Sequence, residues 1–108
     1  FNEGSKIIQL TSGLASIDSN VNPLGPLDAY SMSKVALNML TRRVAKQFES
    51  QKIVVCALSP GWVQTDMGGV DAPASVEQAV AQLTSTIEQL TLAQSGGFFD
   101  EQGQPVAY

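Results

Sequence analysis

Tyr30 and Lys34 are the two residues whose types and spacing most directly suggest chemistry. Four residues of a helix turn about 400°, so both side chains leave one face and can contact one ligand. A tyrosine is a weak acid–base group at neutral pH, and a nearby ammonium favours its phenolate form. A tyrosine held this way can pass a proton to or from a carbonyl or alcohol oxygen. A serine hydroxyl beside it can stabilise charge that develops on the same oxygen.

By itself the pair is a weak signal, because a tyrosine and a lysine four residues apart occur by chance in roughly one chain in five of this length. The alternative is a tyrosine at the start of a helix, followed by a solvated lysine. The pair therefore gains meaning only from the elements that would position it.

Three short β-rich segments predict strands. Residues 6–11 read Lys-Ile-Ile-Gln-Leu-Thr and end at a Ser-Gly turn signal. Residues 52–58 form a continuous run rich in β-branched side chains, which is typical of a strand buried on both faces of a parallel sheet. A Phe-Phe pair at 98–99 begins a third, short strand.

Two longer segments predict helices. Residues 28–50 contain neither Pro nor Gly, and Asp28 can cap their first turn. Ser75 and Gln78 have the spacing of a capping box, and a Gly-Gly pair at 96–97 would end the second helix. Apolar residues at helical spacing mark the side of each helix that we expect to face the core. They are Leu37, Leu40, Val44 and Phe48 in the first helix, and Val76, Val80, Leu83, Ile87 and Leu90 in the second.

The resulting order is strand, helix, strand, helix, strand. Such alternation predicts an α/β fold with a parallel sheet and helices covering its faces. Ligands of open α/β sheets bind at the carboxyl ends of the strands, and Ser12 follows the first strand there. We therefore expect Ser12, Tyr30 and Lys34 to converge on one small volume.

Composition excludes several other classes of chemistry. The chain carries a net charge of −4 and no basic run, so we expect no nucleic-acid partner and no membrane partner. With no histidine, mechanisms that pair it with serine or cysteine are excluded. The single cysteine, Cys56, leaves no internal disulfide; we expect it to be a buried, inert thiol and expect no metal site.

Over nearly its full length the chain resembles the short-chain dehydrogenase/reductase family. Residues 6–12 look like the strand that ends in the catalytic serine, residues 29–37 like the Tyr-x-x-x-Lys helix, and residues 59–65 like the Pro-Gly loop that contacts nicotinamide. The sequences at 33–42 and 60–69 are close to the C-factor-like subgroup. By this resemblance, the fold is the C-terminal half of a Rossmann-type doubly wound parallel sheet.

The resemblance implies roles for three residues. Tyr30 would be the catalytic acid/base, Lys34 would favour its phenolate and hold the nicotinamide ribose, and Ser12 would orient and polarise the substrate carbonyl. In the reduction direction, hydride comes from the nicotinamide and the proton from Tyr30. The substrate would be a carbonyl compound or a secondary alcohol.

The catalytic serine has one competitor. Ser12 lies eighteen residues before Tyr30, which is longer than the family's commonest gap, whereas Ser16 lies fourteen before it and fits that gap better. We choose Ser12 because it follows the strand directly, and because residues 18–26 look like an insertion that the subgroup tolerates.

The resemblance also implies contacts to a cofactor, NADP or NAD, between which the sequence does not choose. The backbone at Pro60 and Gly61 would approach nicotinamide, and Val63 and Thr65 would contact its carboxamide and phosphate. The alternative for Pro60 and Gly61 is an ordinary turn that ends a strand.

The segment after this loop would cover the substrate. Residues 66–73 would form a mobile lid, and Trp62 and Met67 would line the pocket. Ordinary packing is the alternative for all of them.

Residues 1–108 match only part of the family's domain. The sequence contains no strand, Gly-rich turn and helix of the kind that binds a dinucleotide pyrophosphate. We therefore interpret the chain as a partial Rossmann-type domain whose N-terminal dinucleotide-binding half is absent. The chain begins at Phe1 with neither Met nor a leader, and we expect a cytoplasmic protein. When intact, it would form a homo-oligomer, with the long helix at the interface.

Two functions remain open at this point. The first is an NAD(P)-dependent oxidoreductase, represented by its catalytic C-terminal half. The second is a non-enzymatic fragment or interaction module that lacks a cofactor pocket. A Thr-Gly-x-x-x-Gly-x-Gly turn upstream of Phe1 would favour the enzyme.

We expect the isolated 108 residues to have no measurable reductase activity, because the part of the family's domain that grips the cofactor is missing from them. The measurement is turnover of a carbonyl compound by the purified chain with NADPH or NADH, followed through nicotinamide absorbance. Any rate above that of heat-denatured chain would overturn this expectation.

Overall fold

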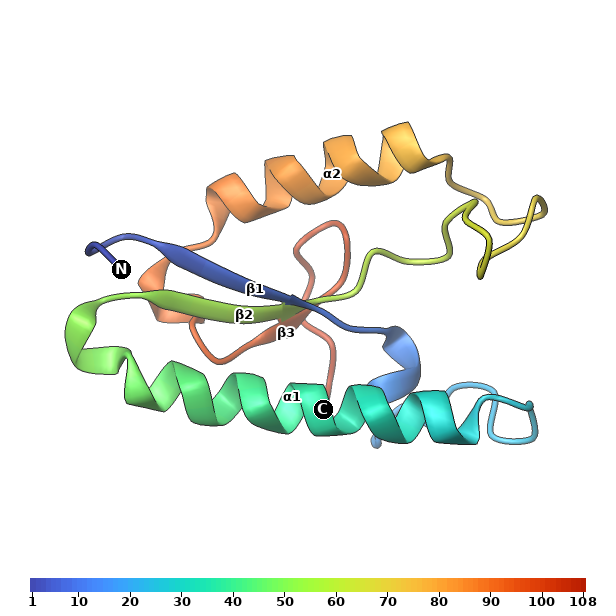
Figure 1. Ribbon diagram of the computed structural model, residues 1–108, viewed down its shortest axis with the longest axis horizontal. Helices are drawn as coiled ribbons and strands as arrows, with labels where there is room; N and C mark the ends of the chain where they lie inside the picture. The colour runs from blue at the N-terminus through green and yellow to red at the C-terminus, as the bar shows by residue number, and fades with distance from the viewer.

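A three-stranded parallel sheet lies between two helices (Figure 1). The computed structural model describes all residues from 1 to 108. Its main elements are β1 (Lys6–Leu10), α1 (Asp28–Gln47), β2 (Val54–Leu58), α2 (Val76–Gln89) and β3 (Phe98–Phe99). Short 3-10 helices cover Gly13–Ala15, Glu49–Gln51 and Leu92–Gln94. The predicted α/β order is confirmed.

The strands lie in the order β1-β2-β3, and both neighbouring pairs are parallel. Lys6 of β1 lies opposite Val54 of β2, and Leu10 lies opposite Leu58. The carboxyl ends of β1 and β2 therefore stop at the same level. Beyond them, the Thr11 N–H donates to the Leu58 carbonyl (2.8 Å), so the two segments leave the sheet side by side.

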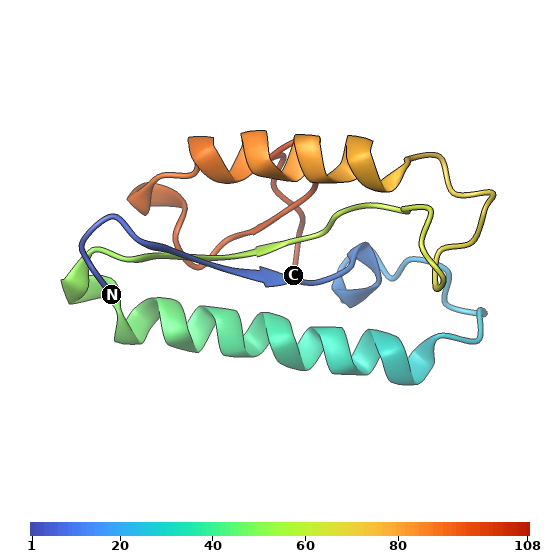
Figure 2. The same ribbon diagram turned by 45° about the horizontal axis from the view of Figure 1, so that its top comes forward.

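The two helices cover opposite faces of the sheet, with α1 on one side and α2 on the other (Figure 2). Every residue of β2 is buried, because alternate side chains of a strand point into opposite layers. Leu58 packs in the layer that includes Ile87 of α2, whereas Val55 packs with Ala45 of α1. The prediction of a strand buried on both faces is confirmed. Neither helix combines the length and the apolar character needed to cross a bilayer.

The thiol of Cys56 lies inside the layer under α2 and is fully buried. Burial raises its pKa above the ordinary value for a cysteine, and hydrogen bonds from backbone groups oppose this only in part. The S–H group donates to the Gln94 carbonyl (3.3 Å). A protonated thiol without access to solvent is a poor nucleophile, so Cys56 is the structural residue that the sequence suggested.

The buried face of α1 differs from the predicted apolar stripe. Asn38, Thr41 and Ala45 are its buried residues, whereas Leu40 of the predicted stripe is 48% exposed. These smaller side chains lie between the helix and the sheet, so the larger apolar ones next to them point partly outward. The stripe was thus wrong at Leu40, although Val44 and Phe48 do pack against the core.

The predicted stripe of α2 is confirmed at Leu83, Ile87 and Leu90, which pack in the core, and is wrong at its first two residues. Val76 and Val80 are exposed, whereas Ala79 and Thr86 are buried. The Thr86 hydroxyl donates to the Glu101 carbonyl (2.7 Å), which ties α2 to the segment that follows β3. Thr86 is therefore buried because its hydroxyl is hydrogen-bonded, and a search for apolar residues at helical spacing does not detect such a position.

The ends of the helices were predicted with mixed success. The capping box of Ser75 and Gln78 is present, with both reciprocal hydrogen bonds. Asp28 is the first helical residue and not the cap, and the residue before it caps nothing through its side chain. The second helix ends at Gln89, before the glycine pair at 96–97, because the next residue turns into the core and a separate 3-10 turn follows.

The last residues fold back beside β3. Phe99 and Pro105 form an antiparallel bridge, and the Val106 N–H donates to the Phe98 carbonyl (2.8 Å). Tyr108 packs against Phe98, and burial raises the pKa of its phenol. This tail covers the outer side of β3, whereas the outer edge of β1 pairs with no strand.

We expect Leu58→Ala to lower the free energy of unfolding by about 2–5 kcal/mol, because it leaves a cavity in the layer under α2. Leu24→Ala is the matched control, since Leu24 is 99% exposed and its loss should leave the unfolding midpoint unchanged. Urea unfolding followed by circular dichroism measures both. Similar effects of the two substitutions would contradict the fold.

Candidate active site

A cavity of about 510 Å³ borders the carboxyl ends of β1 and β2. Its volume falls within the range of roughly 300–1,000 Å³ that is usual for small-molecule sites. Ser12, which follows β1, and Tyr30, in the first turn of α1, line it together with residues 59–63 after β2. Segments far apart in the sequence thus meet at one edge of the sheet.

Most of the residues predicted for catalysis or cofactor binding line this one cavity. They are Ser12, Tyr30, Pro60, Gly61, Val63 and Thr65. Trp62 and Met67, which were expected to line the pocket, also do so. Of the predicted set, only Lys34 lies outside the lining.

Lys34 lies one helical turn beyond Tyr30. Its Nζ donates to the Leu10 carbonyl at the end of β1 (3.0 Å) and lies 5.7 Å from the centre of the Tyr30 ring. At that distance the ammonium acts on the ring electrostatically. Its hydrogen bond also ties α1 to the strand end from which Ser12 emerges.

The two candidate serines have different surroundings. Ser12 is half-buried in the cavity wall, and its Oγ accepts the Leu14 N–H (3.1 Å), which leaves its own O–H free to donate. Ser16 is 2% exposed, donates to the Ala107 carbonyl and accepts the Ser19 N–H. Ser16 therefore holds the C-terminal tail, and only Ser12 reaches the cavity.

The loop after β2 presents its backbone to the cavity. Gly61 has a φ of +79°, a conformation that glycine adopts without strain. The N–H of Val63 has no backbone acceptor and is available to a ligand. The Thr65 hydroxyl is instead used inside the loop, where its Oγ1 accepts the Gly68 N–H (3.0 Å).

These groups fit one end of a nicotinamide dinucleotide. The Val63 N–H suits a carboxamide oxygen, and the Tyr30 hydroxyl suits a ribose hydroxyl. At Gly61 a Cβ would lie 3.3 Å from the Glu101 carboxylate, so a side chain there would crowd the loop. Neither strand-to-helix connection, 11–27 or 59–75, is the short glycine-rich turn that holds a pyrophosphate.

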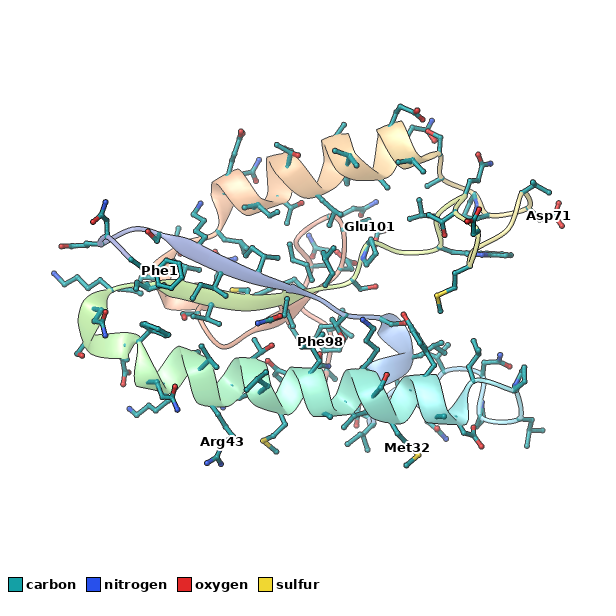
Figure 3. All side chains as sticks on the ribbon, in the orientation of Figure 1. Phe1, Met32, Arg43, Asp71, Phe98 and Glu101 are labelled. Carbon is teal, nitrogen blue, oxygen red and sulfur yellow. The ribbon has the colours of Figure 1, made fainter.

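The segment predicted as a lid is held by its own hydrogen bonds. The Trp62 indole N–H donates to the Gly68 carbonyl (2.7 Å), and the Gln64 amide donates to the Ala72 carbonyl (2.9 Å). The tip with Asp71 extends away from the sheet (Figure 3). The base of the segment is therefore a preformed wall of the cavity, and its role as a lid stays a prediction.

Sequence reasoning missed five residues that line the cavity, namely Gly13, Leu14, Val21, Leu27 and Ser59. Ser59 follows β2 as Ser12 follows β1, so the strand-end rule that selected Ser12 applies to it equally. Leu14, Val21 and Leu27 carried no signal beyond being apolar residues in a segment predicted to be a loop. They show that the insertion-like loop contributes walls to the site.

We expect Ser16→Ala to lower the free energy of unfolding by about 1–3 kcal/mol, because it removes a buried hydroxyl that donates to the Ala107 carbonyl and accepts the Ser19 N–H. Ser12→Ala removes only a half-exposed cap, at a cost of about 0.5–1 kcal/mol. Thermal or urea unfolding of both variants measures the difference. A larger loss in Ser12→Ala would contradict the separate roles of the two serines.

Comparison with known proteins finds relatives over most of the chain. The sequence profile of the family described as enoyl-(acyl carrier protein) reductase matches residues 1–97. C-signal of Myxococcus xanthus is 39% identical over 95% of this chain and 61% of its own length. The solved carbonyl reductase Sniffer of D. melanogaster is 41% identical with a TM-score of 0.89, over 95% of this chain and 41% of Sniffer. The NADPH-bound carbonyl reductase from chicken fatty liver is 34% identical with a TM-score of 0.88, over 95% of this chain and 42% of its own.

The chain thus spans only part of the length of each of these relatives. The matched residues 1–97 include β1, α1 and the loop after β2, which are the segments that build the cavity. Their sequence and their arrangement both agree with the solved carbonyl reductases. The chain belongs to the short-chain dehydrogenase/reductase family.

Proposed function

We propose that the chain is the catalytic C-terminal half of an NADP-dependent oxidoreductase that interconverts a carbonyl compound and a secondary alcohol. The observation that supports this most is that Ser12, Tyr30 and the loop after β2 line a single cavity, with Lys34 beside it. The preference for NADP over NAD is supported by the similarity to the NADPH-bound reductase from chicken fatty liver.

Tyr30 is the proton donor in the direction of reduction. A bound nicotinamide supplies the hydride that reaches the carbonyl carbon, and the Tyr30 hydroxyl gives its proton to the carbonyl oxygen, which yields the alcohol. The Lys34 ammonium, 5.7 Å from the centre of the ring, stabilises the phenolate that remains. The Ser12 hydroxyl donates to the same oxygen and stabilises the negative charge that develops there.

Lys34 also positions the other two groups. Its hydrogen bond to the Leu10 carbonyl joins the first turns of α1 to the end of β1. Ser12 comes two residues after Leu10, and Tyr30 comes one turn before Lys34. A hydroxyl and a phenol carried by different elements are therefore held at a fixed separation, as transfer to one shared oxygen requires.

An interaction module is the second candidate, and exposed apolar side chains on α1 favour it. Met32, Met39 and Leu40 are exposed, and Met32 points away from the sheet in Figure 3. Several large apolar residues on one helix are typical of a surface that another chain or segment covers. We propose that the same surface serves the homo-oligomer expected of the intact protein.

The test places the chain in a complete family domain. In a chimera, residues 1–108 replace the matching part of the Sniffer carbonyl reductase, which keeps its own N-terminal part. We expect the chimera to oxidise NADPH in the presence of a carbonyl compound, and Tyr30→Phe to lower kcat by about 10²–10⁴-fold because the proton donor is lost.

Tyr108→Phe is the matched control, because Tyr108 is the only other tyrosine and its hydroxyl donates to the Gly96 carbonyl away from the cavity. It should retain the rate of the unmodified chimera. A chimera that folds and binds NADPH but turns over no carbonyl compound would favour the interaction module. Full activity in Tyr30→Phe would remove the assigned mechanism.

A further inference from the structure

A second cavity, of about 260 Å³, adjoins the first. Both are lined by Leu14, Val21 and Leu27, so the two cavities adjoin along these three side chains, and we refer to them together as the groove. The groove runs between the 3-10 helix after β1 and the start of α1. Asp28 and Ser31 of α1 border its far part.

The second cavity lies away from the proposed nicotinamide position. All residues that line it fall between 14 and 32, and none comes from the loop after β2. Consider a ligand whose carbonyl lies between Ser12 and Tyr30. Only the part of this ligand that points away from Gly61 and Val63 can enter the second cavity.

The first cavity has mainly apolar walls, the second also presents the polar side chains of Asn20, Asn22 and Ser31, and neither is lined by a positive charge. No charged side chain lines the first cavity, and Asp28 is the only one at the second. Lys34 lies beside the first cavity, but its ammonium binds the Leu10 carbonyl and Lys34 lines neither cavity. The other basic residues are Lys6, Arg42, Arg43, Lys46 and Lys52, and none of them lines the groove. The ion pairs of the chain are Lys46–Glu49 and Lys52–Glu3, so the charge of Asp28 is not neutralised by a neighbouring cation.

We propose that the groove takes an elongated carbonyl compound that carries no negative charge. Its carbonyl lies between Ser12 and Tyr30, a placement that rests on the proposed function. Its apolar chain lies against Leu14, Val21 and Leu27, where burial of hydrocarbon is favourable. An anionic group at the far end would lose water beside the Asp28 carboxylate without gaining a cation, which disfavours binding.

The test compares ligands of different charge and length. Methyl 8-oxononanoate and 8-oxononanoate share the same oxo-acyl chain and differ in charge and in one methyl group, and 2-butanone is too short to reach the second cavity. The readout is the indole N–H signal of Trp62 in a ¹⁵N NMR titration, because Trp62 is the only tryptophan and lines the first cavity. We expect the ester to bind at least about fivefold more tightly than the acid.

Two variants test whether the second cavity causes the tighter binding of the ester. Asp28→Asn should reduce the difference in affinity between the ester and the acid. Glu88→Gln makes the same change of charge on the exposed side of α2 and should leave this difference unchanged.

Ser31→Phe fills the second cavity. It should weaken binding of the ester at least about fivefold and leave the affinity for 2-butanone unchanged. Ser50→Phe is its control, because Ser50 is exposed in the 3-10 helix Glu49–Gln51, which follows α1 at the end away from the groove.

Equal affinity for the ester and the acid would overturn the inference. So would an equal loss of affinity for the ester and for 2-butanone in Ser31→Phe, or a Trp62 signal that responds to no ligand. Turnover by the chimera separates this inference from the proposed function. Preferential binding of the ester without turnover keeps the inference and contradicts the function. Turnover with equal kcat/KM for the ester and the acid supports the proposed function and contradicts the inference.

Discussion

The site depends on two parallel strands that end at the same level and on one hydrogen bond that joins a helix to that level. Leu10 lies opposite Leu58, so the residues that follow the two strands emerge together at one edge. The Lys34 ammonium then binds the Leu10 carbonyl. Because Tyr30 lies one turn before Lys34, this bond holds the start of α1 beside the end of β1, and Tyr30 and Ser12 line the same cavity. The proposed reacting groups are thus positioned by the register of the strands and by one hydrogen bond from a side chain to the backbone.

The chain by itself leaves one strand edge unpaired, some apolar side chains exposed and some buried polar groups without a hydrogen bond. The outer edge of β1 has no partner strand, and Met39 and Leu40 of α1 are exposed. The buried amide of Asn38 and the buried hydroxyl of Thr11 have no hydrogen-bond partner, although such groups are nearly always paired in folded proteins. The proposal of half a domain accounts for the open edge of β1, because a further strand would pair with it, and the exposed residues of α1 belong to the surface proposed for the homo-oligomer. Neither proposal supplies partners for Asn38 and Thr11, whose unpaired atoms are already buried within this chain.

The sequence predicted the order of elements, the parallel sheet and most of the residues that line the cavity, but it predicted the buried faces of the helices only in part. Element type follows from local periodicity and from caps such as Ser75 and Gln78, which depend on neighbouring residues only. The buried face depends on what lies opposite. On α1 the polar residues Asn38 and Thr41 face the sheet while Leu40 is partly exposed. Periodicity cannot choose between two such faces when both carry apolar residues.

Catalysis and selection of the substrate come from different segments of the chain. The proposed reacting groups lie at the end of β1 and in the first turns of α1, and the proposed cofactor contacts come from the loop after β2. The walls of the second cavity come from residues 14–32 alone, which include the insertion-like loop. That loop is anchored at one end by Ser16, whose hydroxyl binds the C-terminal tail. Changes at Asn20, Asn22 or Pro23, which line only the second cavity, can therefore reshape the far end of the groove without moving Ser12 or Tyr30.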